Sequence, residues 1–393
     1  MIVERYNRWN NKSCTGHHQS PERHLYIIKE DTFISLMCVG YMEPQKQKQK
    51  KSKFLGEGSY GCVVEPRVPC NKDVEIYQSN KANTKGAISK LFKYDGDDFK
   101  LETALARKMS TWDRQGDYFI LPYKSCYIKP AELKNNPAVK ECGDFNPTMK
   151  YIPQLVLPYG GEELVKYLDN YQKKFPITHW ILLLKNLLEG IKMLIKNKVI
   201  HQDLHTGNVL YNPADDKLRL IDFGLSIDFD AIYNTTLNPR ITHTYHAYPP
   251  EYMFSKLYLT HMDLSFDDIM RKWKNEVICE NPYGAECYKY YDLYIASQDL
   301  QDNLKSVYDW YRINPAKWFN DVQNYKDRID LYSVGMICID IHGFLDISML
   351  TAKQYDAYIK LIRGLILPDV RIRLDIHTAL EHYEKLVRLI SRG

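Results

Sequence analysis

Two stretches decide the fold: residues 199–210 read VIHQDLHTGNVL, and residues 220–224 read LIDFG. The carboxylates Asp203 and Asp222 and the carboxamide Asn208 lie here among apolar runs. Burying such groups is costly unless protons or metal ions satisfy them. Mg²⁺ prefers oxygen ligands, which Asp222 and Asn208 offer beside phosphate oxygens, and Asp203 is placed to accept the proton of an attacking hydroxyl. The pattern therefore predicts phosphoryl transfer.

A glycine-rich segment upstream supports this prediction. Residues 55–64 read LGEGSYGCVV, in which Gly56, Gly58 and Gly61 let backbone N–H groups approach phosphate oxygens. Alone, this pattern also fits a dinucleotide-binding turn, which requires a helix directly after the glycines. β-prone residues instead continue from Val63. A strand-turn-strand lid over a phosphate site is therefore the favoured interpretation.

A lid of this kind needs a cation to hold the phosphates. Lys90 lies in a strand-like run and is the predicted cation, and Glu102, on a helix expected over about residues 98–112, is its predicted anionic partner. The loop before Lys90 is long, so the alignment leaves alternatives open. Lys85 and Lys93 are the alternatives to Lys90 as the cation, and Asp98 is the alternative to Glu102 as its partner.

Length and composition describe a folded chain of more than one lobe. The chain has 393 residues, of which 45% are hydrophobic and 26% charged, and this excludes a mostly disordered protein. β-prone runs occupy residues 54–65, 87–93, 123–129 and 154–157, whereas residues 178–197 carry apolar side chains at helical spacing. A β-rich segment followed by a helical one predicts an α+β protein with two lobes rather than a doubly wound sheet.

Further motifs follow in chain order, and together they resemble the eukaryotic-type protein kinase family over about residues 54–390. Residues 155–161 look like the hinge that would bind adenine, and residues 248–251 (YPPE) look like the end of an activation segment. Residues 330–335 resemble the DxWSxG helix, and Arg373 resembles the late arginine that pairs with Glu251. The resemblance implies a bilobal protein-kinase-like fold with a small β-rich N-lobe and a large, mainly helical C-lobe.

The resemblance also assigns roles to individual residues. It implies a protein-serine/threonine kinase that transfers the γ-phosphate of ATP to protein hydroxyl groups with Mg²⁺, or with Mn²⁺ in its place. The catalytic residues would be Asp203, Lys90, Glu102 and Thr244, and the metal ligands Asn208 and Asp222. The ATP-binding residues would be Leu55, Gly56, Gly58, Gly61, Val63, Lys90, Leu157, Tyr159, Gly160 and Leu210. Thr244 matches the threonine that bonds the catalytic aspartate in Ser/Thr kinases, and the loop lacks the arginines typical of tyrosine kinases.

Four segments divide the chain on this interpretation. Residues 1–53 form an N-terminal extension that ends in a basic linker, residues 54–157 the N-lobe, and residues 158–390 the C-lobe. Glu251 and Asp330 are 79 residues apart where the family has a short connection, which places an insertion at about residues 253–326. Helix-like stretches in the insertion are expected to pack on the large lobe. A docking partner at this insertion and plain structural elaboration are equally favoured.

Three departures from the family pattern carry information. Gln202 replaces the arginine that normally binds a phosphorylated activation loop, so activation by loop phosphorylation is not expected. Ile88 stands where an alanine usually lies against adenine, and His205 stands where Ser/Thr kinases often carry a lysine. The residues around Asp203 also resemble small-molecule phosphotransferases of the same ancestry.

Two alternatives remain beside the protein kinase: a pseudokinase scaffold and a small-molecule kinase. The pseudokinase is disfavoured because the four residues that the chemistry needs are all present: Lys90, Asp203, Asn208 and Asp222. The net charge of +4 indicates no specific nucleic-acid partner, so the expected partners are protein substrates. Nine scattered cysteines without a CxxC pair favour reduced thiols, and no apolar run reaches the length of about 18 residues that spans a bilayer. We expect an intracellular, soluble protein similar to the divergent kinases of large cytoplasmic DNA viruses, located in host cytoplasm or virion.

Overall fold

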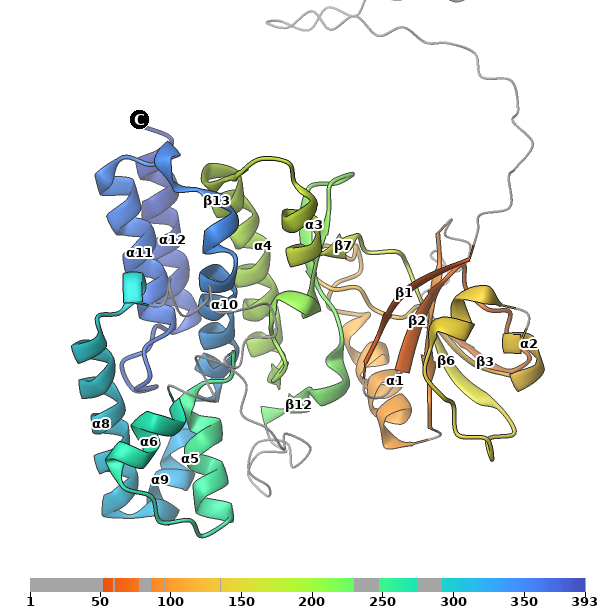
Figure 1. Cartoon of the computed structure of the whole chain (residues 1–393), viewed down its shortest axis with the longest axis horizontal. Helices are drawn as coiled ribbons and strands as arrows, with labels where there is room; N and C mark the ends of the chain where they lie inside the picture. Colours follow the sequence, from red (N-terminus) through yellow and green to blue (C-terminus); the bar gives the residue numbers. More distant parts are fainter. Residues whose placement is uncertain are drawn as a thin grey trace, which may run out of the picture. The chain divides into compact units, whose positions relative to one another are not determined.

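The computed structural model describes residues 52–58, 61–77, 86–94, 96–134, 136–229, 247–273 and 292–392. Their fold is the expected α+β architecture with two lobes. Figure 1 shows the strands β1 to β6 gathered on one side and the long helices α10, α11 and α12 on the other. The chain passes from the sheet to the helical lobe after residue 157, where the last strand of the sheet ends.

The small lobe is built on one antiparallel sheet of six strands. Its spatial order is β1 (Lys53–Glu57), β2 (Gly61–Glu65), β4 (Ile88–Phe92), β6 (Ile152–Leu157), β5 (Lys124–Ile128) and β3 (Lys72–Ile76). Helix α1 (Asp97–Met109) packs on one face, where Phe99 meets Phe92 with ring centroids 5.3 Å apart. The opposite face is buried by the segment between β5 and β6, which contains α2 (Pro130–Lys134) and a 3₁₀ turn (Pro137–Glu141).

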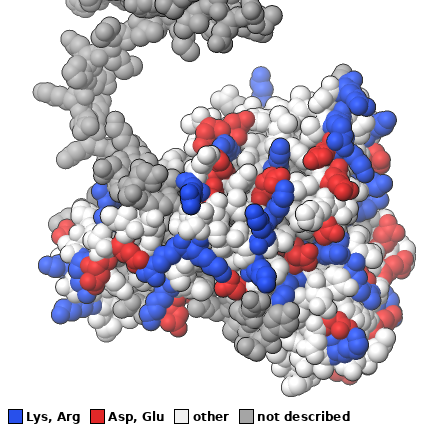
Figure 2. Space-filling view, turned by 180° about the vertical axis from the view of Figure 1, so that it is seen from behind, with Lys and Arg blue, Asp and Glu red and all other residues white. Residues whose placement is uncertain are grey.

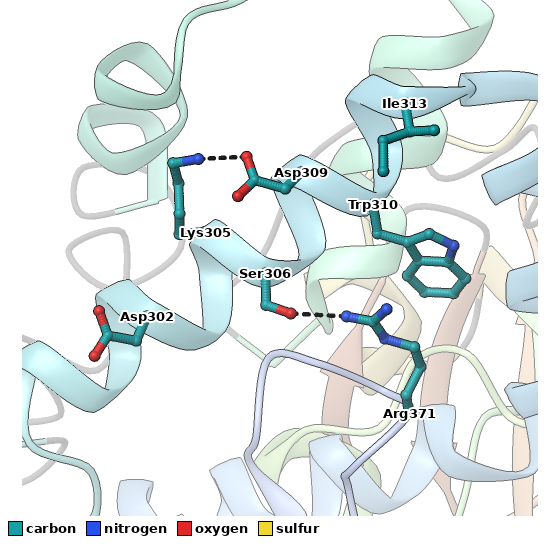
Figure 3. Close-up of a pocket in the computed structure, with 7 residues that line it drawn as sticks. All are labelled: Asp302, Lys305, Ser306, Asp309, Trp310, Ile313 and Arg371. Atoms are coloured by element: carbon teal, nitrogen blue, oxygen red, sulfur yellow. Dashed lines mark hydrogen bonds and ion pairs between the residues drawn. The ribbon is translucent and has the colours of Figure 1, made fainter.

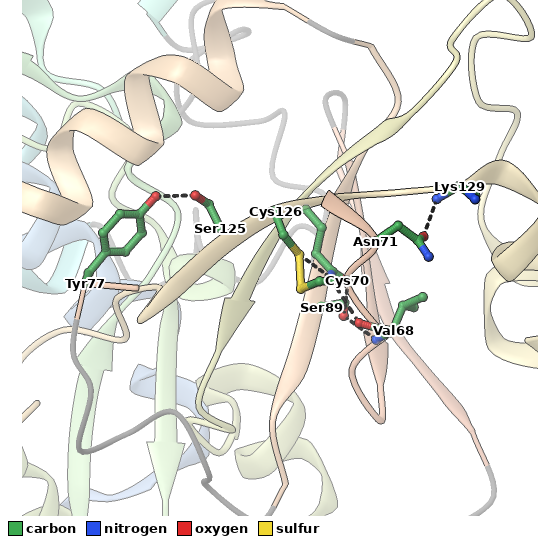
Figure 4. Close-up of a disulfide and its surroundings, with 9 residues drawn as sticks. Val68, Cys70, Asn71, Tyr77, Ser89, Ser125, Cys126 and Lys129 are labelled. Carbon is green, nitrogen blue, oxygen red and sulfur yellow. Dashed lines mark hydrogen bonds between the residues drawn. A yellow bond between two sulfur atoms is a disulfide. The ribbon is translucent and has the colours of Figure 1, made fainter. Parts of the chain in front are cut away.

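Strand β3 was not foreseen, because its KDVEI sequence is mostly exposed and carries little hydrophobic signal. Side-chain contacts of the residues around it tie this segment to the sheet (Figure 4). The backbone N–H of Val68 donates to Ser89 Oγ at 2.8 Å, and the backbone N–H of Lys129 donates to Asn71 Oδ1 at 2.7 Å. The segment therefore gains its structure from neighbours that are distant in sequence.

The small lobe contains two disulfides, Cys62–Cys142 and Cys70–Cys126, and Figure 4 shows the second of them. The prediction of reduced thiols is wrong for these four cysteines. Their partners are 80 and 56 residues apart in sequence, and in each pair the sheet brings the Cα atoms to 5.8 Å. That distance suits a disulfide, but a spacing of this size leaves no recognisable motif in the sequence. Cys338, buried in the large lobe, is free.

The large lobe is organised around two buried helices. On α4 (Ile177–Lys196) the buried side chains Trp180, Leu184 and Leu188 recur every four residues, as its apolar periodicity predicts. Helix α10 (Ile329–Asp340) is buried from Ile329 to Ile339, because its sequence is hydrophobic on all sides. Helices α11 (Ala352–Leu365) and α12 (Ile376–Ile390) pack on these two.

Short strands of the large lobe place the two motifs that contain Asp203 and Asp222. Helix α3 (Leu164–Asn170) lies between the sheet of the small lobe and α4, next to the first of these strands. The strands are β7 (Glu162–Glu163), β8 (Phe175–Pro176), β9 (Val199–Ile200), β10 (Val209–Asn212), β11 (Lys217–Leu220), β12 (Ile227–Asp228) and β13 (Leu345–Asp346). The motif with Asp203 connects β9 to β10, and the motif with Asp222 follows β11 directly.

The described part of the insertion is helical. Helix α5 (Pro250–Leu259) is followed by α6 (Phe266–Lys272), α8 (Ser297–Ile313) and α9 (Pro315–Val322). Phe254 of α5 lies 5.4 Å from Tyr311 and 5.8 Å from Trp318 between ring centroids. These helices of the insertion thus pack on one another through an aromatic cluster. Residues 274–291, which carry several of its tyrosines, lie outside the described part.

Charges of both signs are interspersed on the surface that Figure 2 shows, and no single basic face stands out there. This matches the small net charge of +4. Within the described ranges, no helix combines the length and the apolar composition needed to cross a membrane.

We predict that peptide mapping under non-reducing conditions will recover Cys62 linked to Cys142, and Cys70 linked to Cys126. Each bond restricts the unfolded chain, so reduction should lower the free energy of unfolding by about 2–4 kcal/mol per bond. Urea unfolding with and without dithiothreitol measures this. A variant with all four cysteines replaced by alanine is the control and should not respond to the reductant. Four alkylatable thiols at these positions in unreduced protein would contradict the assignment.

Candidate active site

A buried lysine joins three separate elements of the chain. Lys90 of β4 donates from Nζ to Glu102 Oε1 of α1 at 2.7 Å and to Asp222 Oδ1, just after β11, at 2.8 Å. The side chains of Lys90 and Glu102 are only 13% and 9% exposed. The structure therefore brings together the predicted cation, its predicted partner and the predicted metal ligand. Of the alternatives, Lys93 pairs with Glu57 instead, and Lys85 lies outside the described residues.

The three charges perturb each other because they are buried together. Burial raises the pKa of Glu102 to about 7, the charge of Asp222 acts in the same direction, and Lys90 opposes both. Burial also disfavours the charged forms of Asp222 and Lys90, but their mutual attraction prevails: it lowers the pKa of Asp222 and raises the pKa of Lys90. The Lys90 ammonium is thus held between the lobes by two carboxylates. The pKa of Asp222 is lowered, so it is ionised at neutral pH, whereas Glu102 ionises near neutral pH.

The glycine-rich segment forms the predicted strand-turn-strand lid, and the dinucleotide-binding alternative is wrong. Strands β1 and β2 pair antiparallel, and the N–H of Gly58 donates to the carbonyl of Gly61 at 2.9 Å. A Cβ at Gly61 would lie 2.5 Å from the carbonyl oxygen of Leu91, so packing requires that glycine. A Cβ at Gly56 or Gly58 would meet no described atom within 4 Å. Those two glycines leave open the space that a phosphate group needs.

The residues predicted to bind the nucleotide lie along one face of the sheet and at the hinge. Val63 and Leu155 stand directly opposite Lys90, and Ile88 stands opposite Leu157. Opposed residues share a face, as do residues two apart on one strand. Ile88 therefore lies on the same face of the sheet as Lys90, as the alignment without a register shift requires. Leu55 on β1 is half-buried.

The hinge lies against β10 of the large lobe. A Cβ at Gly160 would come within 2.5 Å of Ile120 and 2.8 Å of Leu210, so only glycine fits there. Leu210 pairs with Glu163 across the β10–β7 ladder. Tyr159, one residue before Gly160, is 44% exposed. Leu210, predicted to bind ATP, and the predicted hinge are thus next to each other.

A buried aspartate of α10 holds the segment that carries Asp203. Asp330 accepts the backbone N–H of His201 at 2.8 Å and that of Gln202 at 3.1 Å. The His201 ring then donates from Nε2 to the carbonyl of Ile221 at 2.9 Å and accepts the N–H of Asp203 at Nδ1 at 3.3 Å. The ring can satisfy both bonds only as the Nε2–H tautomer. His201 therefore couples the two motifs that decide the fold.

Both carboxylate oxygens of Asp203 are hydrogen-bonded. Asn208 Nδ2 donates to the Asp203 carbonyl at 2.7 Å and to Oδ2 at 3.2 Å. The Tyr248 hydroxyl donates to Oδ1 at 2.9 Å. Tyr248 was not predicted as a site residue: it lies inside the YPPE motif, but nothing in that pattern points to Asp203. Thr244, the residue expected to bond Asp203, lies outside the described residues.

The oxygen donors of the site fit a magnesium ion. Asn208 uses its amide nitrogen on Asp203, so its amide oxygen is the atom left for a metal. The carboxylate of Asp222 is 43% exposed and pairs with Lys90 through Oδ1. Among the described residues, no three His, Cys, Asp or Glu side chains gather to form a metal cage. Mg²⁺ is usually held this way, by one or two protein oxygens completed by phosphate oxygens and water.

A second buried ion pair fixes the end of the segment that follows. Arg373 donates from Nη2 to both carboxylate oxygens of Glu251, at 2.9 and 3.2 Å, and both side chains are almost fully buried. Burial raises the pKa of Glu251, and Arg373 opposes this effect. This is the pairing that the resemblance implied.

Gln202 is buried where the family usually has an arginine. Its backbone adopts a left-handed conformation with φ of 67°, and its side chain is 2% exposed. Neither polar atom of its amide has a hydrogen-bond partner among the described residues. The site thus offers a neutral amide instead of the cation that would bind a phosphorylated loop.

Comparisons with known proteins agree with this geometry. Residues 131–265 match the protein kinase domain. The chain is similar to "Serine/threonine-protein kinase US3 homolog" of Equine herpesvirus 1 strain Ab4p, with 31% identity over 70 residues and 18% of each chain covered. "Serine/threonine-protein kinase" of strain Kentucky A gives the same identity and coverage. The chain therefore spans less than a fifth of the length of these curated relatives. The resemblance to protein kinases that the motifs predict is confirmed.

Replacing Lys90 by methionine should weaken binding of Mg²⁺·ATP by about 10- to 100-fold. A hydrogen bond to a charged group contributes about 1.5–3 kcal/mol, and the variant loses the cation that would face the phosphates. Calorimetric titration with a non-hydrolysable ATP analogue measures the effect. Lys166→Met, which removes an exposed lysine paired with Glu163, is the control and should bind like the wild type. Equal affinity of both variants would exclude Lys90 from the nucleotide site.

Replacing Arg373 by methionine should destabilise the large lobe by about 3–5 kcal/mol, because Glu251 then stays buried without a partner. The double variant Arg373→Met/Glu251→Met should recover a large part of that loss. Urea unfolding of the single and double variants measures both effects. Strictly additive losses would show that the two side chains are not coupled.

Proposed function

We propose that this chain, whose residues 131–265 match the protein kinase domain, is a protein-serine/threonine kinase that transfers the γ-phosphate of ATP to protein hydroxyl groups. The observation that carries the proposal is the position of Lys90. Its amine contacts both Glu102 and Asp222, so the predicted phosphate-binding cation and the predicted metal ligand share one point between the lobes. Phosphoryl transfer needs positive charge at the place where phosphate charge develops.

Each residue of the site then has a defined part in the reaction. Lys90 holds the α- and β-phosphates, and Glu102 positions its amine. Asp203 accepts and orients the hydroxyl of the protein substrate. Asp222 and the amide oxygen of Asn208 hold Mg²⁺, or Mn²⁺, which when bound neutralises phosphate charge. Catalysis on this account consists mainly of positioning and charge stabilisation.

Observations on the large lobe favour a protein substrate over a small molecule. Glu251 pairs with Arg373, and Asp330 supports the backbone at His201. In protein kinases these features belong to the lobe that binds peptides. The relatives from Equine herpesvirus 1 are named as serine/threonine-protein kinases, which supports Ser/Thr specificity. Thr244, the predicted marker of that specificity, stays a prediction.

The pseudokinase alternative has less support. Lys90, Glu102 and Asp222 are brought into contact, and Asp203 and Asn208 are hydrogen-bonded to each other. A scaffold that binds no nucleotide has no physical need to bury three charges together.

The domain division follows from the same proposal. Residues 1–53 would be an extension, residues 54–157 and 158–390 the two lobes, and residues 253–326 the insertion. We place the protein among viral kinases, acting in host cytoplasm or virion, because the relatives named above are viral.

The insertion offers a surface for a protein partner. Helix α8 and the chain at Arg371 line a shallow cavity of about 520 Å³ (Figure 3). The Arg371 guanidinium lies 4.5 Å from the ring centroid of Trp310 and donates to Ser306 Oγ at 2.7 Å. Ile313 at the end of α8 is 84% exposed. We propose that a docking partner binds here.

Transfer of ³²P from labelled ATP to a generic basic protein tests the activity. We expect labelling by the wild type and a loss of at least 100-fold in Asp203→Asn, since the substituted amide cannot accept the proton. Both proteins should bind the ATP analogue equally. Equal labelling by the two proteins would contradict the proposed role of Asp203. Labelling of a sugar, lipid or aminoglycoside panel without protein labelling would favour the small-molecule kinase.

A further inference from the structure

Tyr248 contacts the residue to which the proposed function assigns the substrate proton. Its hydroxyl donates to Asp203 Oδ1 at 2.9 Å, and the other carboxylate oxygen accepts from Asn208 Nδ2 at 3.2 Å. The two donors come from different parts of the chain: Asn208 from the 3₁₀ turn before β10, and Tyr248 from the residues just before α5. Together they give each oxygen of the carboxylate one fixed bond.

The ring of Tyr248 is held rigidly. Only 9% of the residue is exposed, and its ring stacks on Tyr252 with centroids 4.9 Å apart and planes 20° apart. Both rings belong to a small apolar cluster with Ile200 and Ile329. Ile200 directly precedes the segment that carries Asp203, so the cluster places the phenol and the carboxylate on a common support.

The backbone next to Tyr248 is also anchored. Ser333 Oγ of α10 donates to the carbonyl of Ala247 at 2.7 Å. Pro249 follows at the N-cap of α5, and its ring fixes one backbone dihedral. Glu251, two residues further on, is held by Arg373. The hydroxyl therefore reaches Asp203 from a fixed position.

We propose that Tyr248 is a positioning residue for Asp203, which sets the carboxylate orientation that accepts the substrate hydroxyl. The proposal rests on the proposed kinase function. A carboxylate oxygen can accept more than one hydrogen bond, so the substrate hydroxyl binds to the lone pairs that Tyr248 and Asn208 leave open. Preorganised hydrogen bonds of this kind lower the barrier because the group does not have to reorient during the reaction.

The contact also restricts the substrate. The hydroxyl of the substrate has to approach Asp203 beside the buried ring of Tyr248. The substrate side chain cannot displace this ring without breaking its stacking on Tyr252. The opposite possibility is that the Tyr248 hydroxyl occupies the acceptor position and blocks the substrate. The two arrangements predict changes of opposite sign when the hydroxyl is removed.

The test is Tyr248→Phe, which keeps the ring and its stacking and removes only the hydroxyl. We expect kcat for labelling of a basic protein to fall about 10-fold, with the KM for ATP and the melting temperature unchanged. Tyr252→Phe is the matched control: it removes the hydroxyl of the stacked neighbour, which has no hydrogen-bond partner in the described part of the chain, and should keep the wild-type kcat.

Other outcomes distinguish a failure of the proposed Tyr248 role from a failure of the proposed kinase function. An unchanged kcat in Tyr248→Phe, with an active wild type, would overturn the positioning role alone. A raised kcat or kcat/KM would overturn it as well and show that the hydroxyl blocks the acceptor position. A drop in melting temperature that accounts for the lost activity would reduce the contact to a structural one. A wild type that binds ATP but labels no protein would overturn the proposed function, and the positioning role with it.

Discussion

The structure depends on the positive charge of Lys90, which Glu102 and Asp222 share. The amine of Lys90 is buried and bonded to carboxylates from α1 and from the segment after β11. A buried cation without partners would be costly, and two anions without it would repel each other, so each group requires the others. This constraint aligns β4, α1 and the large lobe. The glycine lid on one side and the hinge on the other then border the same space.

A second set of buried polar contacts holds the backbone segments that carry Asp203 and Asp222. Asp330 holds the backbone before Asp203, His201 joins that backbone to the segment of Asp222, and Arg373 fixes Glu251. Asp330 belongs to α10, whose residues Leu331, Val334 and Ile337 are part of the main hydrophobic core, and Arg373 belongs to the chain before α12. These contacts place the hydrogen bonds around Asp203 and Asp222 on buried, rigid elements. Such support suits the proposed phosphoryl transfer, which relies on positioning.

The sequence predicts those parts of the fold that depend on local patterns. The helix α4 follows from its periodicity, and Lys90, Glu102, Asn208 and Asp222 follow from motifs that are short and ordered. Features created by long-range pairing were missed. Strand β3 has little hydrophobic signal, the disulfides join cysteines 80 and 56 residues apart, and the contact of Tyr248 with Asp203 spans 45 residues. Such contacts leave no spacing rule in a single chain, because the sheet and the packing of α5 create them.

A crystal structure of the whole chain with a non-hydrolysable ATP analogue and Mn²⁺ tests the central claim most directly. The account predicts anomalous density for the metal between Asp222 and the amide oxygen of Asn208, with α- and β-phosphate oxygens within hydrogen-bond distance of Lys90 Nζ. A nucleotide bound elsewhere, or bound in the cleft with its phosphates and metal away from Lys90 and Asp222, would contradict it.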